Sequence, residues 1–238
     1  MRRTLRIGFA CIVAMALFLT VVLGWLFFDT QGLPNIQSLA QFAPGEKTQV
    51  TDPCLEAPSV AVPYELIGGN LRSALEAAET PEDDPGAAAA TFRAFAERRG
   101  PGSVSLSMRI ARTSSCGPAR EPDRRIREIR FAVQLESRFS RRQMFTIFAN
   151  RLFFGKNIVG VESASQHYFH KEPNQLLLGE SALLVGLARS PARYSPEAHP
   201  DRALLRRNQV IDAMAERHLI SEPEASIAKA TPLKVISD

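Results

Sequence analysis

Two glutamates and a group of arginines are the residues whose types and spacing could do chemistry. Glu128 falls on the apolar flank of a helix predicted over residues 123–139, and Arg124 lies one turn earlier on the same side. A carboxylate on an apolar flank loses hydration, so it needs a cationic partner or a role that tolerates a shifted pKa. Glu128 is therefore a candidate acid–base residue, and a buried Glu128–Arg124 ion pair is the structural alternative.

Glu79 has a different kind of position, at the C-terminal end of a helix predicted over residues 71–79. The negative pole of a helix disfavours an anion and tends to raise a carboxyl pKa. A raised pKa suits a general base that must hold a proton during a reaction. An ordinary exposed glutamate is the alternative interpretation.

The third feature is a local excess of positive charge. Residues 120–142 contain eight Arg and four acidic residues, a local net charge of +4. The planar guanidinium group suits bidentate contacts with phosphate, which makes this region a candidate for binding a diphosphate. A solvated helix face would produce the same pattern.

The elements that must position these residues are mostly helices. Periodic apolar residues and proline stops predict helices over 71–79, 123–139, 141–152 and 180–189, with Asn70 as a candidate N-cap for the first. The acidic, Ala-rich segment 81–101 contains a short predicted helix over 91–98. No alternating run is long enough for a major sheet, so the chain is predicted to be mainly α.

The N-terminus predicts a membrane anchor. Arg2, Arg3 and Arg6 precede 22 uncharged, apolar residues, 7–28, which at about 1.5 Å per residue span a hydrocarbon core. Positive charge is retained in the cytoplasm, so residues 1–6 are predicted to be a cytoplasmic tail and the C-terminal domain to be translocated. A cleaved signal peptide is the alternative, although its apolar region is usually shorter.

Composition limits the class of protein. The whole chain carries a net charge of +4, but residues 29–238 carry only +1, because the first 28 residues contain three Arg and no acid. Such a small excess is not typical of a nucleic-acid-binding domain. Residues 29–59 contain several prolines and no sustained period, which predicts a stalk. Cys54 and Cys116 form an even pair outside the anchor, compatible with a disulfide in an oxidising exterior.

Several motifs between residues 124 and 214 resemble glycosyltransferase family 51, the peptidoglycan transglycosylases. The stretch RRIREIRFAVQLE at 124–136 resembles the third motif of that family, an Arg/Lys pair followed by Glu, Ala and a closing Glu. The stretches FANRLFFG at 148–155, GVESASQHYF at 160–169, ESALLVGLARSP at 180–191, YSP at 194–196 and RRNQV at 206–210 resemble the motifs that follow.

Upstream of residue 124, the chain departs from the family pattern. Residues 60–79 resemble the approach to the first motif, but its catalytic Glu-Asp pair is Glu79-Thr80 here. Residues 102–109 align with the second motif, Gly-Gly-Ser-Thr-Ile-Thr-Gln-Gln, and both Gln are replaced, by Met108 and Arg109. The positively charged positions are retained better than the hydrogen-bonding ones.

The resemblance implies a lysozyme-like helical glycosyltransferase domain over 60–220, followed by a C-terminal tail over 221–238. Its members polymerise lipid II into glycan strands by inverting transfer, releasing undecaprenyl diphosphate. Glu79 would be the base that deprotonates the acceptor hydroxyl, and Glu128 would assist departure of the diphosphate. The residues implied to bind pyrophosphate or sugar are Arg112, Arg120, Arg109, Arg124, Arg127 and Ser105.

The same resemblance implies the surroundings of the enzyme. The substrates are lipid II and the growing glycan strand, the domain would lie on the periplasmic side of the cytoplasmic membrane, and other wall synthases such as penicillin-binding proteins would be partners. Some members use Mg²⁺ or Mn²⁺ at the pyrophosphate, although this sequence shows no metal-ligand spacing. The altered motifs leave two alternatives: a catalytically degenerate member that binds lipid II or acts as a scaffold, and a protein that transfers a different polyprenyl-linked sugar or hydrolyses glycosides.

Overall fold

The computed structural model describes residues 33–51, 54, 57–79, 86, 105–114, 124–232 and 235–236, with residues 13, 15–20 and 24 nearer the N-terminus. The side chain of Glu79 is outside this description. The chain divides into two compact units, Met1–Leu33 and Pro34–Asp238. Most of the predicted anchor at 7–28 lies outside the described residues, and no helix among the described ones is long and apolar enough to cross a membrane.

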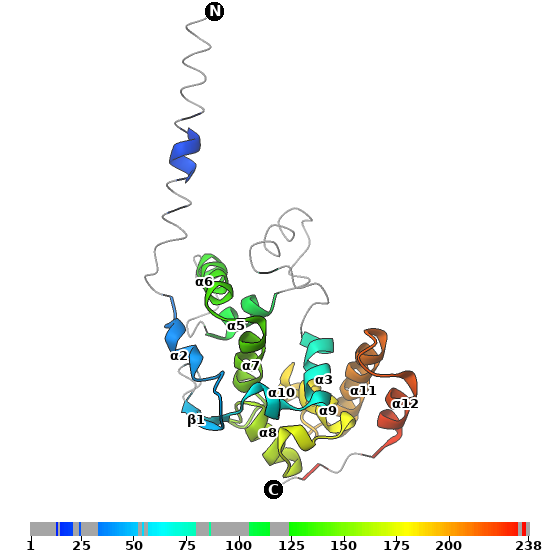
Figure 1. Ribbon diagram of the computed structural model, residues 1–238. Coiled ribbons are helices and arrows are strands. Elements are labelled where there is room, and N and C mark those ends of the chain that lie inside the picture. Colours follow the sequence, from blue (N-terminus) through cyan, green and yellow to red (C-terminus); the bar gives the residue numbers. More distant parts are fainter. Residues whose placement is uncertain are drawn as a thin grey trace, which may run out of the picture. The chain divides into compact units, whose positions relative to one another are not determined.

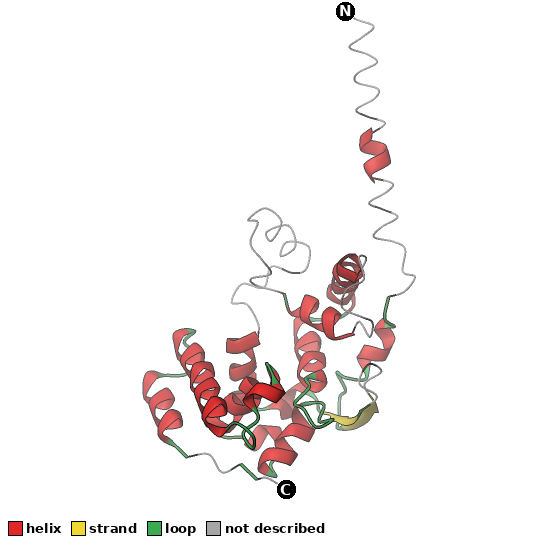
Figure 2. Cartoon of the chain, turned by 180° about the vertical axis from the view of Figure 1, so that it is seen from behind, coloured by secondary structure: helices red, strands yellow, loops and turns green. Residues whose placement is uncertain are grey.

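The second unit is mainly helical, as the sequence predicts (Figure 2). The strands among its described residues form an antiparallel pair, in which Thr48 pairs with Ala61 and Thr51 with Pro58. In chain order, the elements are α2 (Ile36–Ala40), β1 (Thr48–Thr51), β2 (Pro58–Ala61), η1 (Tyr64–Ile67), α3 (Gly69–Glu79), α5 (Leu106–Ser114), α6 (Arg124–Arg138), α7 (Arg141–Arg151), α8 (Val161–Phe169), η2 (Pro173–Gln175), α9 (Leu178–Ala188), α10 (Pro191–Tyr194), α11 (Pro200–Glu216) and α12 (Glu222–Ala230).

The helices pack in two groups. Helix α5 packs against α6 and α7, while α9 packs against α3 and α11, and α12 packs against α11 (Figure 1). Helix α8 contacts α7, α9 and β2, and η1 contacts both α7 and η2. The candidate residues Glu79 and Glu128 therefore belong to helices of different groups, α3 and α6.

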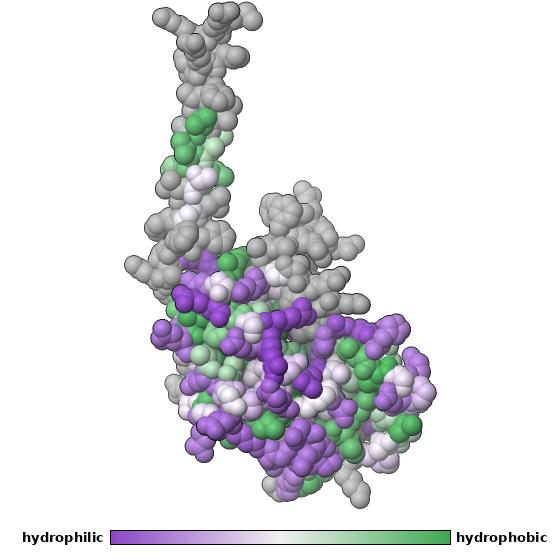
Figure 3. Space-filling view, in the orientation of Figure 1, coloured by the Kyte–Doolittle hydropathy of each residue, from purple (hydrophilic) through white to green (hydrophobic). Residues whose placement is uncertain are grey.

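Local sequence explains why several of these helices begin where they do. Ser140 and Gln143 form a capping box at the start of α7, and Ser221 and Glu224 form another at the start of α12. Hydrogen bonds from the backbone and side chain of Ser221 lower the pKa of the Glu224 carboxyl. Helix α9 is buried on almost all sides, as expected for its apolar sequence. On the surface, hydrophilic residues cover much of the face of the second unit that Figure 3 shows.

The segment predicted as a stalk, 29–59, differs from the structure. From Pro34 onward, it belongs to the second compact unit and contains α2, β1 and the start of β2. Leu39 and Phe42 are almost completely buried. Periodicity could not reveal this packing, because the segment is short and irregular and is held by residues more than 100 positions away. The predicted C-terminal tail likewise contains α12, which packs on α11.

Two further expectations differ from the structure. Asn70 does not cap α3, which begins at Gly69; its side-chain amide instead donates to the carbonyl of Leu176 at 2.9 Å. Helices α5, α8 and α11 lie outside the helix ranges that the sequence predicts. The predicted helix at 91–98 lies outside the described residues.

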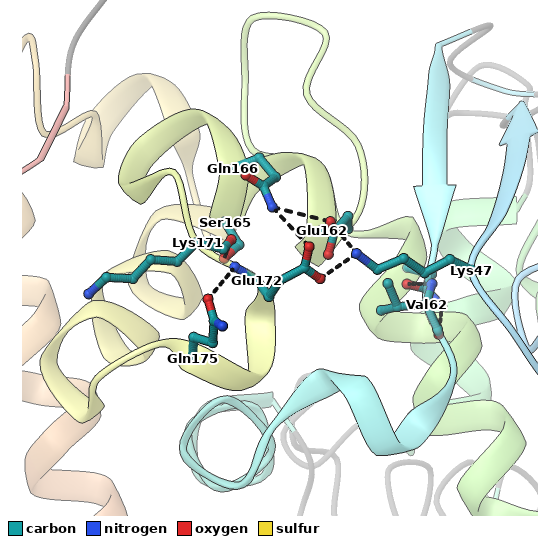
Figure 4. Close-up of polar contacts among 9 residues, drawn as sticks. Lys47, Val62, Glu162, Ser165, Gln166, Lys171, Glu172 and Gln175 are labelled. Atoms are coloured by element: carbon teal, nitrogen blue, oxygen red, sulfur yellow. Dashed lines mark hydrogen bonds and ion pairs between the residues drawn. The ribbon is translucent and has the colours of Figure 1, made fainter.

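A polar cluster joins the N-terminal part of this unit to α8 and η2. The Lys47 ammonium group lies 3.0 Å from Oε1 of the buried Glu162 and also contacts Glu172, while the Gln166 amide reaches both carboxylates at 3.4 Å (Figure 4). Burial disfavours the charged ammonium, but the hydrogen bonds to Glu172 and Glu162 outweigh burial and raise the pKa of Lys47. The cluster therefore contributes to holding the chain before β1 against the helical part.

Replacing Lys47 with Met should lower the free energy of unfolding by about 1–2 kcal/mol, because two carboxylates lose their shared cation and one of them is buried. The expected loss is small because the Lys47 side chain is about one-third exposed. Urea denaturation measures the change. Lys229→Met is a matched control, since Lys229 pairs with the more exposed Asp212; an equal loss in both variants would contradict the prediction.

Position 68 requires glycine for two reasons, its left-handed backbone conformation and the close approach of neighbouring main-chain atoms. It has φ of +79°, and a Cβ built there would lie 2.6 Å from Cα of Asn174 and 2.8 Å from the carbonyl oxygen of Pro173. Gly68→Ala should lower the free energy of unfolding by about 1–3 kcal/mol. Thermal or urea denaturation tests this. Gly69→Ala is the control, because a Cβ added at Gly69 would meet nothing within 4 Å, and it should leave stability unchanged or slightly higher.

Candidate active site

Glu128 lies on α6 between two guanidinium groups. Its side chain is buried, with the residue 6% exposed. Oε1 accepts a hydrogen bond from Nε of Arg124 at 2.7 Å, and Oε2 lies 3.6 Å from Nε of Arg112 on α5. The i,i+4 pair with Arg124 is thus present, and so is the contact with Arg112, which only packing of two helices could create.

Arg124 also ties α6 to the end of α5. Its Nη2 lies 3.4 Å from the carbonyl oxygen of Arg112 and donates to it. This carbonyl belongs to the last turn of α5, where backbone acceptors have no partner within the helix. Arg112 and Arg124 are one-third and one-fifth exposed, respectively, so both cations remain accessible at the edge of the buried carboxylate.

The other candidate residues of this region have different settings. Arg109 lies one turn before Arg112 on α5, and Arg127 lies one turn after Arg124 on α6; both are half-buried and engaged in contacts. Ser105 directly precedes α5 and is fully buried. Its hydroxyl accepts from the backbone N–H of Met108 at 3.3 Å, so it caps α5.

Glu79 is the last residue of α3, as the sequence predicts. At the last turn of this helix, the Arg217 guanidinium donates to the carbonyl oxygen of Glu76. The positive charge of Arg217 stabilises the negative pole of the helix. The sequence alone does not reveal this contact. The Glu79 side chain lies outside the described residues, so the convergence of Glu79 with Glu128 stays a prediction.

Some predictions concern residues beyond the described part of the chain. Arg120 and Cys116 both fall there. Cys54 is disulfide-bonded, and its sulfur lies 3.4 Å from the carbonyl oxygen of Ser114, two positions before Cys116 in the sequence. This neighbourhood supports the Cys54–Cys116 pairing, which stays a prediction.

Arg151 is a residue near the site that sequence reasoning missed, and Glu136 is the closing Glu of the third motif, to which the sequence assigned no role. Arg151 is buried at the end of α7, where it donates to the hydroxyl of Ser114 and to the carbonyl oxygen of Thr113. It thereby supplies a positive charge at the C-terminal end of α5. Glu136 contacts the first turn of α5 through Ser107. Its position eight residues after Glu128 was a signal available in the sequence.

This arrangement can stabilise negative charge beside a carboxylate. Two partly exposed guanidinium groups flank one buried carboxylate on a pair of packed helices. Guanidinium groups bind phosphate oxygens in bidentate geometry, and cations already in place stabilise an anion that develops during a reaction. The described residues contain no group of three or more His, Cys, Asp or Glu that could hold a metal ion.

The chain is similar to a family of known proteins. A family model described as Transglycosylase matches residues 83–215. Penicillin-binding protein 1A of Aquifex aeolicus (strain VF5) is 34% identical over 134 residues, covering 56% of this chain and 18% of that protein. Penicillin-binding protein 1A of Vibrio cholerae serotype O1 is 28% identical over 262 residues, covering 98% of this chain and 30% of that protein.

A solved structure also aligns, that of penicillin-binding protein 1A from Haemophilus influenzae, with 31% identity and a TM-score of 0.39 over 43% of this chain and 16% of that one. The chain spans less than a third of the length of these relatives. The family match includes Arg112, Arg124 and Glu128 and begins four residues after Glu79. Because this match extends over more than half of the chain, the protein belongs to the transglycosylase family, glycosyltransferase family 51.

Proposed function

We propose that the protein is a membrane-anchored peptidoglycan glycosyltransferase, which polymerises lipid II into glycan strands and releases undecaprenyl diphosphate. The single observation that carries this proposal is the buried Glu128 between Arg112 and Arg124, within the stretch that matches the transglycosylase family. A buried carboxylate beside accessible cations suits a reaction whose leaving group is a diphosphate.

The proposed transfer is a single displacement with inversion. The acceptor hydroxyl oxygen attacks the anomeric carbon of the donor, and Glu79 takes the hydroxyl proton. The bond between that carbon and the diphosphate oxygen breaks, and the electron pair leaves with the diphosphate. Arg112 and Arg120 hold the diphosphate, Glu128 assists its departure, and Arg109, Arg124 and Arg127 complete the substrate site. Ser105 is fully buried and supports the site by capping α5.

The proposed location follows from the substrates. Both are attached to lipid, so an anchor at residues 7–28 would keep the site near the periplasmic surface of the cytoplasmic membrane. Other wall synthases are the proposed protein partners.

The divalent cation used by some family members has little support at Glu128. Both oxygens of this carboxylate lie next to guanidinium groups, which already supply positive charge there. A hard cation such as Mg²⁺ or Mn²⁺ prefers several oxygen ligands, and the described residues do not group them. No step of the proposed transfer is therefore routed through a metal ion.

A second candidate function is a degenerate member that binds lipid II without turning it over. The direct hydrogen bond from Arg124 to Glu128 favours this candidate, because a carboxylate engaged in an ion pair is less available for chemistry. Binding of lipid II with no product under any metal condition would support this candidate.

The test is lipid II polymerisation by the purified full-length protein, with products separated by length. Glycan strands that form in proportion to enzyme establish the glycosyltransferase, whereas absence of strands eliminates it. Incubation with purified sacculi provides the third arm, because release of soluble fragments would indicate hydrolysis instead.

A further inference from the structure

Glu136 ends a chain of buried hydroxyl groups at the start of α5. Its Oε1 accepts a hydrogen bond from the Ser107 hydroxyl at 2.5 Å, and the Ser105 hydroxyl lies 2.9 Å from that of Ser107. Both serines are about 1% exposed or less. Hydrogen bonds to a charged acceptor are stronger than neutral ones, and an anion near the N-terminus of a helix is stabilised by its positive pole.

The same carboxylate lies against the main chain of Gly86. A Cβ built on Gly86 would lie 3.1 Å from Oε2 of Glu136 and 3.3 Å from Oε1, and φ of Gly86 is +78°. A side chain at this position would crowd the carboxylate and strain the backbone. The Glu136 carboxylate therefore lies close to both α5 and Gly86, which restricts where it can lie.

Helix α6 holds α5 at both ends through two carboxylates. Glu136 contacts Ser107 in the first turn of α5, and Glu128, eight residues earlier on α6, lies beside Arg112 in the last turn. A helix of nine residues is too short to be stable alone, so contacts with its neighbours determine its position. A shift at the first turn would therefore move Arg112 at the other end.

We propose that Glu136 is a positioning residue, which holds α5 so that Arg112 stays beside Glu128. Its effect on the reaction rests on the proposed function, whereas its effect on α5 does not. Loss of the contact would let α5 shift along α6, and the guanidinium group that should meet the diphosphate would shift with it.

The experiment compares Glu136→Ala, Glu136→Gln and Ser107→Ala, with the exposed Glu216→Ala on α11 as the control. Hydrogen–deuterium exchange of residues 105–114 should rise in Glu136→Ala and Ser107→Ala and remain near the wild-type level in Glu136→Gln, whose amide oxygen can still accept from Ser107. In the polymerisation assay, Glu136→Ala should lower kcat by about 10- to 100-fold with a smaller change in KM, and Glu136→Gln should recover most of kcat.

A double mutant distinguishes the loss of the Glu136 contact with α5 from a general loss of stability. If Ser107 and Glu136 act through one hydrogen bond, the double alanine variant should lose no more kcat than Glu136→Ala alone. Exchange that rises equally in α5 and α11, or an unchanged kcat in Glu136→Ala, would overturn the proposal. If the wild type makes no polymer, but exchange in the variants still rises only in residues 105–114, the proposed function is refuted and the role of Glu136 in holding α5 is supported.

Discussion

Replacing Glu128 with Gln should lower the rate of lipid II polymerisation by about 10²- to 10⁴-fold, the range expected for loss of an acid–base group. The substitution preserves the shape of the side chain and one acceptor oxygen for Arg124, but removes the negative charge between Arg112 and Arg124. The measurement is the initial rate of glycan strand formation at saturating lipid II.

The fold should survive this substitution. Arg112 and Arg124 are partly exposed, so water can solvate the guanidinium groups after the carboxylate becomes neutral. Circular dichroism and the unfolding temperature should therefore remain close to those of the wild type. Glu216→Gln, at an exposed position at the end of α11, is the matched control and should retain full activity. Wild-type rates in Glu128→Gln would refute the assigned role of Glu128.

The largest effect on stability is expected for Asn150→Ala. Asn150 is completely buried on α7, where its side-chain oxygen accepts from the backbone N–H of Val62 at 3.1 Å. Its amide donates to the carbonyl oxygens of Phe42 and Val62 at 2.9 and 2.8 Å. Each buried backbone group left without a partner costs about 1–3 kcal/mol, so we expect a loss of about 3–5 kcal/mol in the free energy of unfolding.

Urea denaturation measures this loss, and limited proteolysis should show new cleavage within residues 34–61, the segment that Asn150 holds. Asn150→Asp provides a second test, since its carboxylate can accept from Val62 but repels the two carbonyl oxygens. It should be at least as destabilising as the alanine variant. Asn174→Ala, at an exposed position in η2, is the control and should change stability by no more than about 0.5 kcal/mol. Similar losses at positions 150 and 174 would contradict the assignment.

Sequence reasoning succeeds where helix geometry alone decides the answer. The apolar period over 123–139 predicts α6 to within one residue at either end, and the four-residue spacing of Arg124 and Glu128 predicts their ion pair. Helices α7 and α9 are likewise predicted to within a few residues, because proline stops and apolar periods mark them. The spacing of residues along one helix determines the face on which each side chain lies, so these predictions need no knowledge of the rest of the chain.

Helix α5 shows where such reasoning stops. Its first residues align with a family motif, but the sequence analysis assigns no helix there, and its place depends on α6 and α7. Ser105 illustrates the consequence, since a residue proposed to contact substrate is buried and caps the helix. Capping and burial depend on neighbouring elements, which the spacing of residues within one segment does not specify.

By itself, the sequence determined that the chain is mainly helical, that it carries transglycosylase motifs, and that Glu128 lies on the apolar flank of a helix beside Arg124. Only the tertiary structure decided that Arg112 joins this pair, that Glu136 contacts the other end of α5, and that residues 34–61 pack against α7 and α8. The physical reason is that contacts within one helix follow from its fixed rise and turn. Contacts between distant segments depend instead on which faces are buried together, and many arrangements of the same helices satisfy the same local patterns.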